Sequence, residues 1–225
     1  MTAASFVAGA WLANGAPTAA TRLHEMFALR VNQALALLLL VLLSPLLAII
    51  SFLIWRRDGA PVLFAHYRVG HDGKLFRCMK FRTMLRNSDQ VLAELLSISQ
   101  AAREEWARDQ KLLNDPRITP VGQFLRRSSL DELPQLLNVL RGEMSLVGPR
   151  PITVAELTRY GRARWHYLSV RPGITGLWQV SGRNNTTYDE RVELDRCYVE
   201  QRSFVGDLRI LILTVRVVAL REGAR

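Results

Sequence analysis

A long apolar run over residues 31–55, VNQALALLLLVLLSPLLAIISFLIW, constrains this chain more than any other feature of its sequence. The run contains no charged side chain. As a straight helix rising about 1.5 Å per residue it would be roughly 37 Å long, enough to cross a bilayer core of about 30 Å. Pro45, near the middle, has no N–H, and its ring collides with the carbonyl oxygen of Val41, so the sequence predicts a kink at Ser44 and Pro45. We expect the Ser44 hydroxyl to donate to the carbonyl of Leu40 or Val41, which reduces the cost of an unpaired carbonyl in hydrocarbon.

The residues by themselves leave the path of this helix open between two alternatives. A kinked helix can span the membrane, or it can enter and return to the same side as a re-entrant hairpin. Arginines flank the run on both sides, which favours a cytoplasmic position for both ends. They are Arg22, Arg30, Arg56, Arg57 and Arg68. A third alternative, the buried core helix of a soluble protein, fits less well with so long and so uniformly apolar a run.

The charge balance favours an anionic partner. The chain carries 30 lysines and arginines against 20 acidic residues, a net charge of +10. Phosphate esters, an anionic lipid surface and nucleic acid are the classes that such a balance suits. No recognition helix or zinc-finger pattern is visible, so we expect no nucleic-acid partner. The two cysteines, Cys78 and Cys197, are too few for a disulfide framework and fit a reducing compartment.

We predict an α+β fold that is mainly helical, in three parts. Residues 1–28 form a flexible tail without the basic start of a signal peptide, residues 29–57 form the membrane helix broken at Ser44 and Pro45, and residues 58–225 form a cytosolic catalytic domain. Alternating polarity around the turn His71–Gly73 predicts two short strands, over residues 62–67 and 75–82. The remaining pattern predicts helices over residues 90–112, 121–127, 133–140, 153–167 and 188–201, and a structured glycine-containing loop over residues 171–182.

The C-terminal segment, residues 204–225, is heavily apolar and carries the spaced arginines Arg209, Arg216 and Arg221. We predict an amphipathic helix that lies at the membrane surface, with its arginines reaching lipid phosphates. The alternative is an ordinary core helix or a buried strand, because many of its residues are β-branched.

Asp131 and Glu132 stand side by side just before Pro134 and an apolar helical stretch. Taken alone, such acids are typical of a helix start, with Ser128 or Ser129 as its cap. Basic residues at the ends of predicted strands and loops suggest a pocket instead. Two carboxylates among several cations suit a metal-bound diphosphate, because carboxylates hold Mg²⁺ and arginine forks hold phosphate oxygens. The candidate substrate-binding cations are Lys80, Arg82, Arg126, Arg127, Arg150, Arg171 and Arg183.

Five sequence blocks resemble one known family. They are KFRTM (residues 80–84), DPRITPVG (115–122), SLDELPQLLNVLRGEMSLVGPRP (129–151), RPGITGLWQVSGRN (171–184) and YDERVELD (188–195). In this order, over about residues 31–220, they resemble the bacterial sugar transferases, the monotopic polyprenol-phosphate phosphoglycosyl transferases. We expect the short type that initiates exopolysaccharide synthesis.

The resemblance implies a reaction, a location and a site. A hexose-1-phosphate, with galactose or glucose as the expected sugar, would pass from a UDP-sugar to undecaprenyl phosphate with release of UMP, at the cytoplasmic face of the bacterial inner membrane. The resemblance also implies the re-entrant hairpin. Asp131 would be the nucleophile that carries a covalent phosphosugar, and Glu132 would hold Mg²⁺ beside it. The residues that would line the substrate site are Lys80, Arg126, Arg150, Arg183 and Asp195.

An aspartate nucleophile needs little further help. Its carboxylate is ionised at neutral pH and requires no general base, and we expect the flanking cations to keep the pKa of Asp131 low. Two alternatives stay open: direct metal-assisted attack by the lipid phosphate without a covalent intermediate, and a membrane-anchored adaptor without activity. A homodimer is a further partner to be tested.

Overall fold

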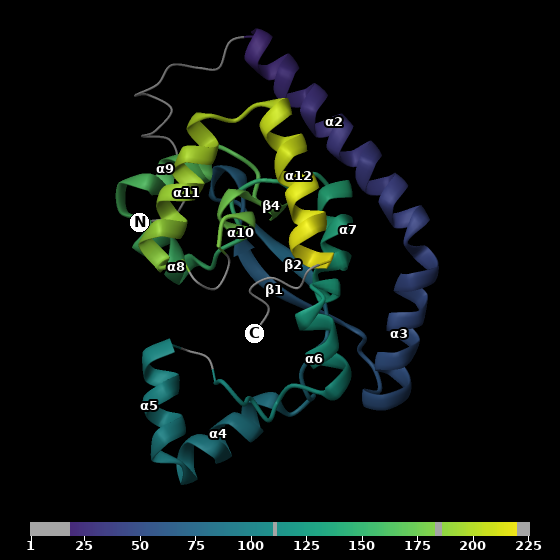
Figure 1. The fold of residues 1–225 in the computed structure, drawn as a ribbon, viewed down its shortest axis with the longest axis vertical. Coiled ribbons are helices and arrows are strands. Elements are labelled where there is room, and N and C mark those ends of the chain that lie inside the picture. The colour runs from purple at the N-terminus through teal and green to yellow at the C-terminus, as the bar shows by residue number, and fades with distance from the viewer. Residues whose placement is uncertain (1–18, 110–111, 183–185, 220–225) are drawn as a thin grey trace.

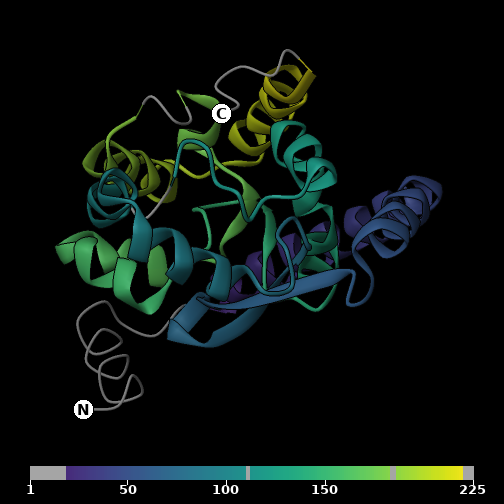
Figure 2. The same ribbon diagram turned by 90° about the horizontal axis from the view of Figure 1, so that it is seen from below.

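The computed structural model describes residues 19–109, 112–182 and 186–219. Two long helices, α2 (Ala19–Leu42) and α3 (Ser44–Asp58), run along one side of the molecule (Figure 1). A body of short strands and helices lies beside them, and the hairpin of β1 and β2 crosses its lower face in the second view (Figure 2). The mainly helical α+β fold that the sequence predicts is therefore confirmed.

The strands form two small two-stranded sheets. β1 (Leu63–Val69) pairs antiparallel with β2 (Leu75–Phe81), and β3 (Ser145–Val147) pairs parallel with β4 (Gly173–Thr175). The α-helices of the body are α4 (Ser88–Ile98), α5 (Gln100–Asp109), α6 (Pro120–Arg127), α7 (Leu136–Leu140), α8 (Val154–Arg159), α9 (Arg164–Leu168), α10 (Leu177–Val180), α11 (Tyr188–Glu200) and α12 (Phe204–Ala219). Three 3₁₀ turns join them: η1 (His71–Gly73), η2 (Leu130–Gln135) and η3 (Gly161–Ala163).

Helix α2 begins at Ala19, so the prediction of a flexible tail through residue 28 is wrong for residues 19–28. Residues 1–18 lie outside the described part of the chain. The middle of the helix is held by side-chain contacts with the body: the Gln33 Nε2 donates to the carbonyl of Leu140 at 2.9 Å, and the N–H of Leu146 donates to Asn32 Oδ1 at 2.8 Å. These contacts join segments more than a hundred residues apart, which local sequence patterns do not report.

The predicted break in the apolar run is confirmed. Leu43 separates α2 from α3, and the Ser44 hydroxyl donates to the carbonyl of Val41 at 2.8 Å, as its position before Pro45 predicts. Beyond the break α3 leads away at an open angle and does not lie alongside α2 (Figure 1). The re-entrant path through a membrane stays a prediction.

One face of the two helices packs against the body and the other is exposed. Ala36, Ile50 and Ile54 are buried, whereas the exposed apolar side chains include Leu38, Val41, Leu42, Phe52 and Trp55. By length and composition, Glu25–Leu42 could cross a membrane, and only 6% of that window is buried. The alternative of a buried core helix is therefore wrong.

The hairpin confirms the two predicted strands. Asp72 adopts a left-handed conformation with φ of 56°, and Gly73 follows with φ of 74°, so the tight turn falls where the sequence places it. The edge of β2 that faces away from β1 is held by α7, because the buried Asn138 side chain forms hydrogen bonds with the backbone of Met79 and Arg77. This tether sets where β2 lies relative to η2, which directly precedes α7.

Three predicted helices are divided. The helix predicted over residues 90–112 is divided into α4 and α5, because Ser99 leaves the helix and its hydroxyl accepts the N–H of Ala102 at 3.2 Å, capping the second helix. Residues 110 and 111 lie outside the described part of the chain. Residues 153–167 form α8, η3 and α9, with Gly161 at a positive φ of 50°. Residues 133–140 divide into the end of η2 and α7.

The predicted loop over residues 171–182 contains both a strand and a helix, β4 and α10. Gly173 permits this pairing, since a Cβ there would lie 2.1 Å from the backbone nitrogen of Gly148. Residues 204–219 of the C-terminal segment form the helix α12, so the alternative of a buried strand is wrong for them. Arg221 lies outside the described residues.

Candidate active site

The acidic pair lies on a 3₁₀ turn whose shape is decided by the residues around it. Ser129 enters the turn in a left-handed conformation with φ of 56°, and Pro134 lies inside it. The turn packs against β2 and α6, and only 8% of Asp131 is exposed. The pair is therefore the start of a helical segment, as its local sequence predicts, and also part of a buried cluster of charges.

Lys80, Asp131, Glu132 and Arg150 come together from three segments of the chain. The Lys80 Nζ lies 2.6 Å from Glu132 Oε1 and 3.9 Å from Asp131 Oδ2. Arg150, in the loop after β3, places its Nη2 2.9 Å from the same Glu132 oxygen. One oxygen of Glu132 therefore pairs with two cations, whereas Asp131 makes only a long contact with Lys80 among these interactions.

The two acids differ in their electrostatics. Burial opposes the ionisation of Glu132, but Arg150 and Lys80 outweigh it and lower its pKa to about 2. Burial raises the pKa of Asp131, Lys80 opposes that rise, and the nearby Glu132 charge adds to it. The expectation that flanking cations keep the pKa of Asp131 low is therefore wrong, because the cations are engaged mainly by Glu132.

Arg126 and Asp195 lie near this cluster without joining its ion pairs. Arg126 donates from Nε to the Thr83 hydroxyl at 2.9 Å, and the Asp131 charge partly offsets the lowering of its pKa by burial. Asp195 accepts a hydrogen bond from the Tyr160 hydroxyl at 2.8 Å. Burial raises the pKa of Asp195 to about 7, against the effects of Tyr160 and Arg150. Its Oδ1 is buried and has no hydrogen-bond partner within the described residues.

Two of the predicted substrate-binding cations make their hydrogen bonds away from the acidic pair. Arg82 is buried and donates to the backbone carbonyls of Asp58, Gly59 and Pro61, so it stabilises the turn after α3. Arg171 donates from Nε to the carbonyl of Gly142 at 2.9 Å. Alternation along a strand predicts the face to which a side chain points, but it does not predict which groups of other segments the side chain contacts there. Arg183 lies outside the described residues.

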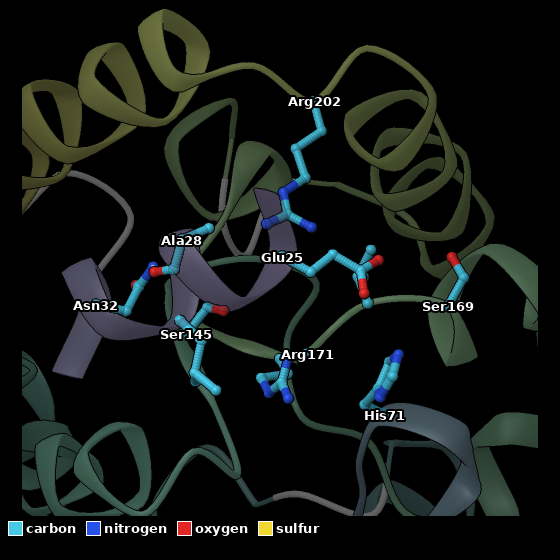
Figure 3. A pocket seen from close by; sticks show the side chains of 10 residues that line it. Glu25, Ala28, Asn32, His71, Ser145, Ser169, Arg171 and Arg202 are labelled. Atoms are coloured by element: carbon cyan, nitrogen blue, oxygen red, sulfur yellow. The ribbon is translucent and has the colours of Figure 1, made fainter. Parts of the chain in front are cut away.

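Arg171 does not lie at the acidic pair. It borders a small polar cavity near the turn that joins β1 and β2. The cavity has a volume of about 20 Å³ and lies where α2 meets the η1 turn. Figure 3 shows Arg171, Arg202 and His71 around it, with Glu25 between them. Lys80 belongs to the opposite end of β2, where it pairs with Phe64 near the open end of the hairpin. The two sites are therefore separate.

Sequence reasoning missed two residues beside the cluster, Trp178 and Arg191. The Arg150 guanidinium carbon lies 6.0 Å from the centroid of the Trp178 ring, and that of Arg191 lies 4.7 Å from the same ring. One signal was available: Arg191 and Asp195 are four residues apart and therefore share a face of the predicted helix.

The acidic pair could hold Mg²⁺ only if a bound ligand supplied further donor oxygens. In the described parts of the chain, no group of three or more His, Cys, Asp or Glu side chains is placed to hold a metal. Mg²⁺ is commonly bound by one or two carboxylates together with substrate phosphates. Asp131 and Glu132 match that donor set, although one Glu132 oxygen already receives Lys80 and Arg150.

Comparison with known proteins gives consistent matches along the chain. A family model described as "Bacterial sugar transferase" matches residues 24–221. "Undecaprenyl-phosphate galactose phosphotransferase" of Salmonella typhimurium is 49% identical over 217 residues, which cover 89% of this chain and 45% of that protein. "Exopolysaccharide production protein ExoY" of Sinorhizobium fredii is 50% identical over 190 residues, 84% of each chain. "UDP-glucose:undecaprenyl-phosphate glucose-1-phosphate transferase" of Escherichia coli is 41% identical over 190 residues, 80% of this chain and 38% of that protein.

The chain thus spans less than half the length of the Salmonella and Escherichia proteins and most of the length of ExoY. The matched region includes the hairpin, the acidic pair and α11. Both the order of the five sequence blocks and the match of the family model lead to the same conclusion: the chain belongs to the bacterial sugar transferase family.

Proposed function

We propose that this protein transfers a hexose-1-phosphate from a UDP-sugar to undecaprenyl phosphate and releases UMP, as the first membrane step of exopolysaccharide, O-antigen or capsule synthesis. The observation that carries the proposal is the cluster in which Lys80 and Arg150 meet Asp131 and Glu132. Such a cluster suits the meeting of anionic groups, because its cations offset their repulsion. The names of the relatives support the same substrates, with galactose or glucose as the sugar.

The geometry supports different roles for the two acids. Glu132 accepts both Lys80 and Arg150 and keeps its charge, with a pKa of about 2. Within the described residues, the ion pair of Asp131 is limited to the 3.9 Å approach of Lys80, and burial raises its pKa, so its oxygens are more basic than those of an exposed carboxylate. Acid and base roles in catalytic pairs follow such opposed pKa shifts. Asp131 is therefore the nucleophile, and Glu132 orients the cations.

Two displacements at phosphorus complete the reaction. First, a carboxylate oxygen of Asp131 bonds to the phosphorus that bears the hexose, and the bond from that phosphorus to the bridging oxygen breaks, so that UMP leaves with the electron pair. Second, an oxygen of undecaprenyl phosphate bonds to the same phosphorus, and the bond to Asp131 breaks, which restores the carboxylate. The acyl phosphate between these steps is a mixed anhydride and stays activated. One diphosphate bond replaces another, so little net driving force is needed.

The proposal includes Mg²⁺, held by Asp131 and Glu132 together with phosphate oxygens of the donor. When bound, the ion supplies positive charge that offsets the negative charge of the diphosphate. Chelation with EDTA should abolish UMP release, and added Mg²⁺ should restore it. Activity that persists after exhaustive chelation would remove the metal from the proposal.

We also propose a membrane position at the cytoplasmic face of the bacterial inner membrane. The exposed leucines of α2 and α3 support insertion, and α12 adds a second apolar face made of Phe204, Val205, Leu208, Ile212 and Val215. A helix with such a face lies in the plane of the headgroups. The break at Ser44 supports a re-entrant path. Labelling of a cysteine introduced before α2 only from the periplasmic side would refute that path.

The covalent step is testable without the lipid. We expect protein incubated with UDP-sugar that is radiolabelled at the sugar-bearing phosphate to retain label and to release one equivalent of UMP. Asp131→Asn should lower UMP release by a thousandfold or more, while the matched control Asp89→Asn, at an exposed site in α4, should be unchanged. An active enzyme that retains no label under single-turnover conditions would favour direct attack by the lipid phosphate.

A further inference from the structure

Arg191 lies beside the catalytic cluster although it touches neither acid. It belongs to α11, whose start is held by a capping box in which Thr187 and Glu190 bond to each other's backbone N–H groups. Its Nε donates to the Thr186 hydroxyl at 3.2 Å, and its guanidinium lies over the Trp178 ring, 4.7 Å from the ring centroid. Thr186 and Trp178 are therefore among the partners that orient the side chain.

Trp178 connects Arg191 with the acidic pair. The indole is buried, and the Arg150 guanidinium lies 6.0 Å from the centroid of the same ring. Arg150 in turn contacts Glu132 at 2.9 Å. A continuous path of contacts thus leads from the acid beside the proposed nucleophile, through Arg150 and Trp178, to Arg191.

The positive charges of Arg150 and Arg191 repel each other. Burial lowers the pKa of Arg191, and the charge of Arg150 lowers it further. The Tyr188 and Tyr160 hydroxyls and the Glu156 carboxylate offset this lowering only in part, since the pKa of Arg191 stays below its usual value. Glu132 is shared between Arg150 and Lys80. An anion with more than one negative oxygen, bound between the two guanidiniums, would relieve this repulsion and would match their planar donor geometry.

We propose that Arg191 is a further substrate-binding residue, which with Arg150 holds the diphosphate of the nucleotide donor across Trp178. The inference rests on the proposed function, since the diphosphate belongs to the proposed UDP-sugar. In this arrangement Arg150 serves the phosphate nearer the acidic pair, and Arg191 serves the phosphate farther from it, on the nucleoside side.

The test compares ligands that share a base and differ in charge. Binding of UDP and of uridine is measured by isothermal titration calorimetry on the full-length protein in lipid nanodiscs, for wild type, Arg191→Gln, Arg191→Lys and Arg196→Gln. Arg196 is the matched control, because it lies on the same helix but pairs with Glu193 and Glu200 at the surface. We expect Arg191→Gln to weaken UDP binding about tenfold or more and to leave uridine binding unchanged. Arg191→Lys should retain the charge but lose the fork, with an intermediate loss.

Each outcome decides the question. An unchanged dissociation constant for UDP in Arg191→Gln, or an equal loss for UDP and uridine, would overturn the role of Arg191. If Arg191→Gln does not fold, the Lys variant gives the answer: a selective loss for UDP supports the proposal, and equal changes for both ligands refute it. A wild-type protein that binds UDP no more tightly than uridine and releases no UMP would instead reject the proposed function.

Discussion

Replacing Asn138 tests how the catalytic pair is held against the strand that carries Lys80. The Asn138 side chain is 0% exposed. Its Oδ1 accepts the N–H of Met79 at 3.0 Å, and its Nδ2 donates to the carbonyl of Arg77 at 2.8 Å and to Glu143 Oε2 at 2.6 Å. Asn138→Ala removes these three bonds at once and leaves two backbone groups of β2 without a partner.

The expected loss of stability is large. Each buried group left unsatisfied costs about 1–3 kcal/mol, so the Met79 N–H and the Arg77 carbonyl together cost about 4 kcal/mol. Glu143 is only half-buried and can recover water. In a chain of this size that loss lowers the melting temperature by roughly 10 °C. UMP release should also fall, because Lys80 is on the same strand and its position relative to Glu132 is no longer held.

Thermal unfolding of the purified protein in nanodiscs, followed by circular dichroism, measures the loss. Gln90→Ala serves as the control, since Gln90 is exposed on α4, and a change there should stay within about 0.5 kcal/mol. A shift of less than 2 °C for Asn138→Ala, with normal UMP release, would refute the conclusion that this side chain tethers β2 to α7.

Two other perturbations follow from buried groups. Burial raises the pKa of Asp195 from 3.8 to about 7, so the folded state favours the protonated acid. The contribution of Asp195 to stability should therefore be fully present below about pH 4 and fall by about 4 kcal/mol as the pH rises from about 4 to above 7. Asp195→Asn should remove this slope from a plot of melting temperature against pH, and an unchanged slope would contradict the assignment. Gly122→Ala would place a Cβ 2.0 Å from the carbonyl oxygen of Thr83. It should force α6 away from the segment that follows β2, at a cost of about 2 kcal/mol in urea unfolding; a wild-type urea midpoint would contradict that contact.

Features that depend on neighbouring residues were predictable from the sequence. The break at Ser44 and Pro45 follows from the missing N–H of proline, and the hydroxyl bond to Val41 follows from spacing along one helical turn. The turn at Asp72 and Gly73 follows from residues that tolerate a positive φ. Adjacent acids among spaced cations, together with the order of the motifs, were sufficient to predict the family.

Only the tertiary structure decided which cations contact the two acids and in which direction the pKa of each acid shifts. Lys80 lies near the end of β2 and Arg82 directly follows the strand, yet Lys80 contacts Glu132, while Arg82 donates to backbone carbonyls after α3. The pKa of Asp131 rises where the sequence predicted a low value, because burial exceeds the effect of cations already engaged by Glu132. Local geometry acts over a few residues and can be read from the sequence, whereas burial and ion pairing depend on segments that only folding brings together.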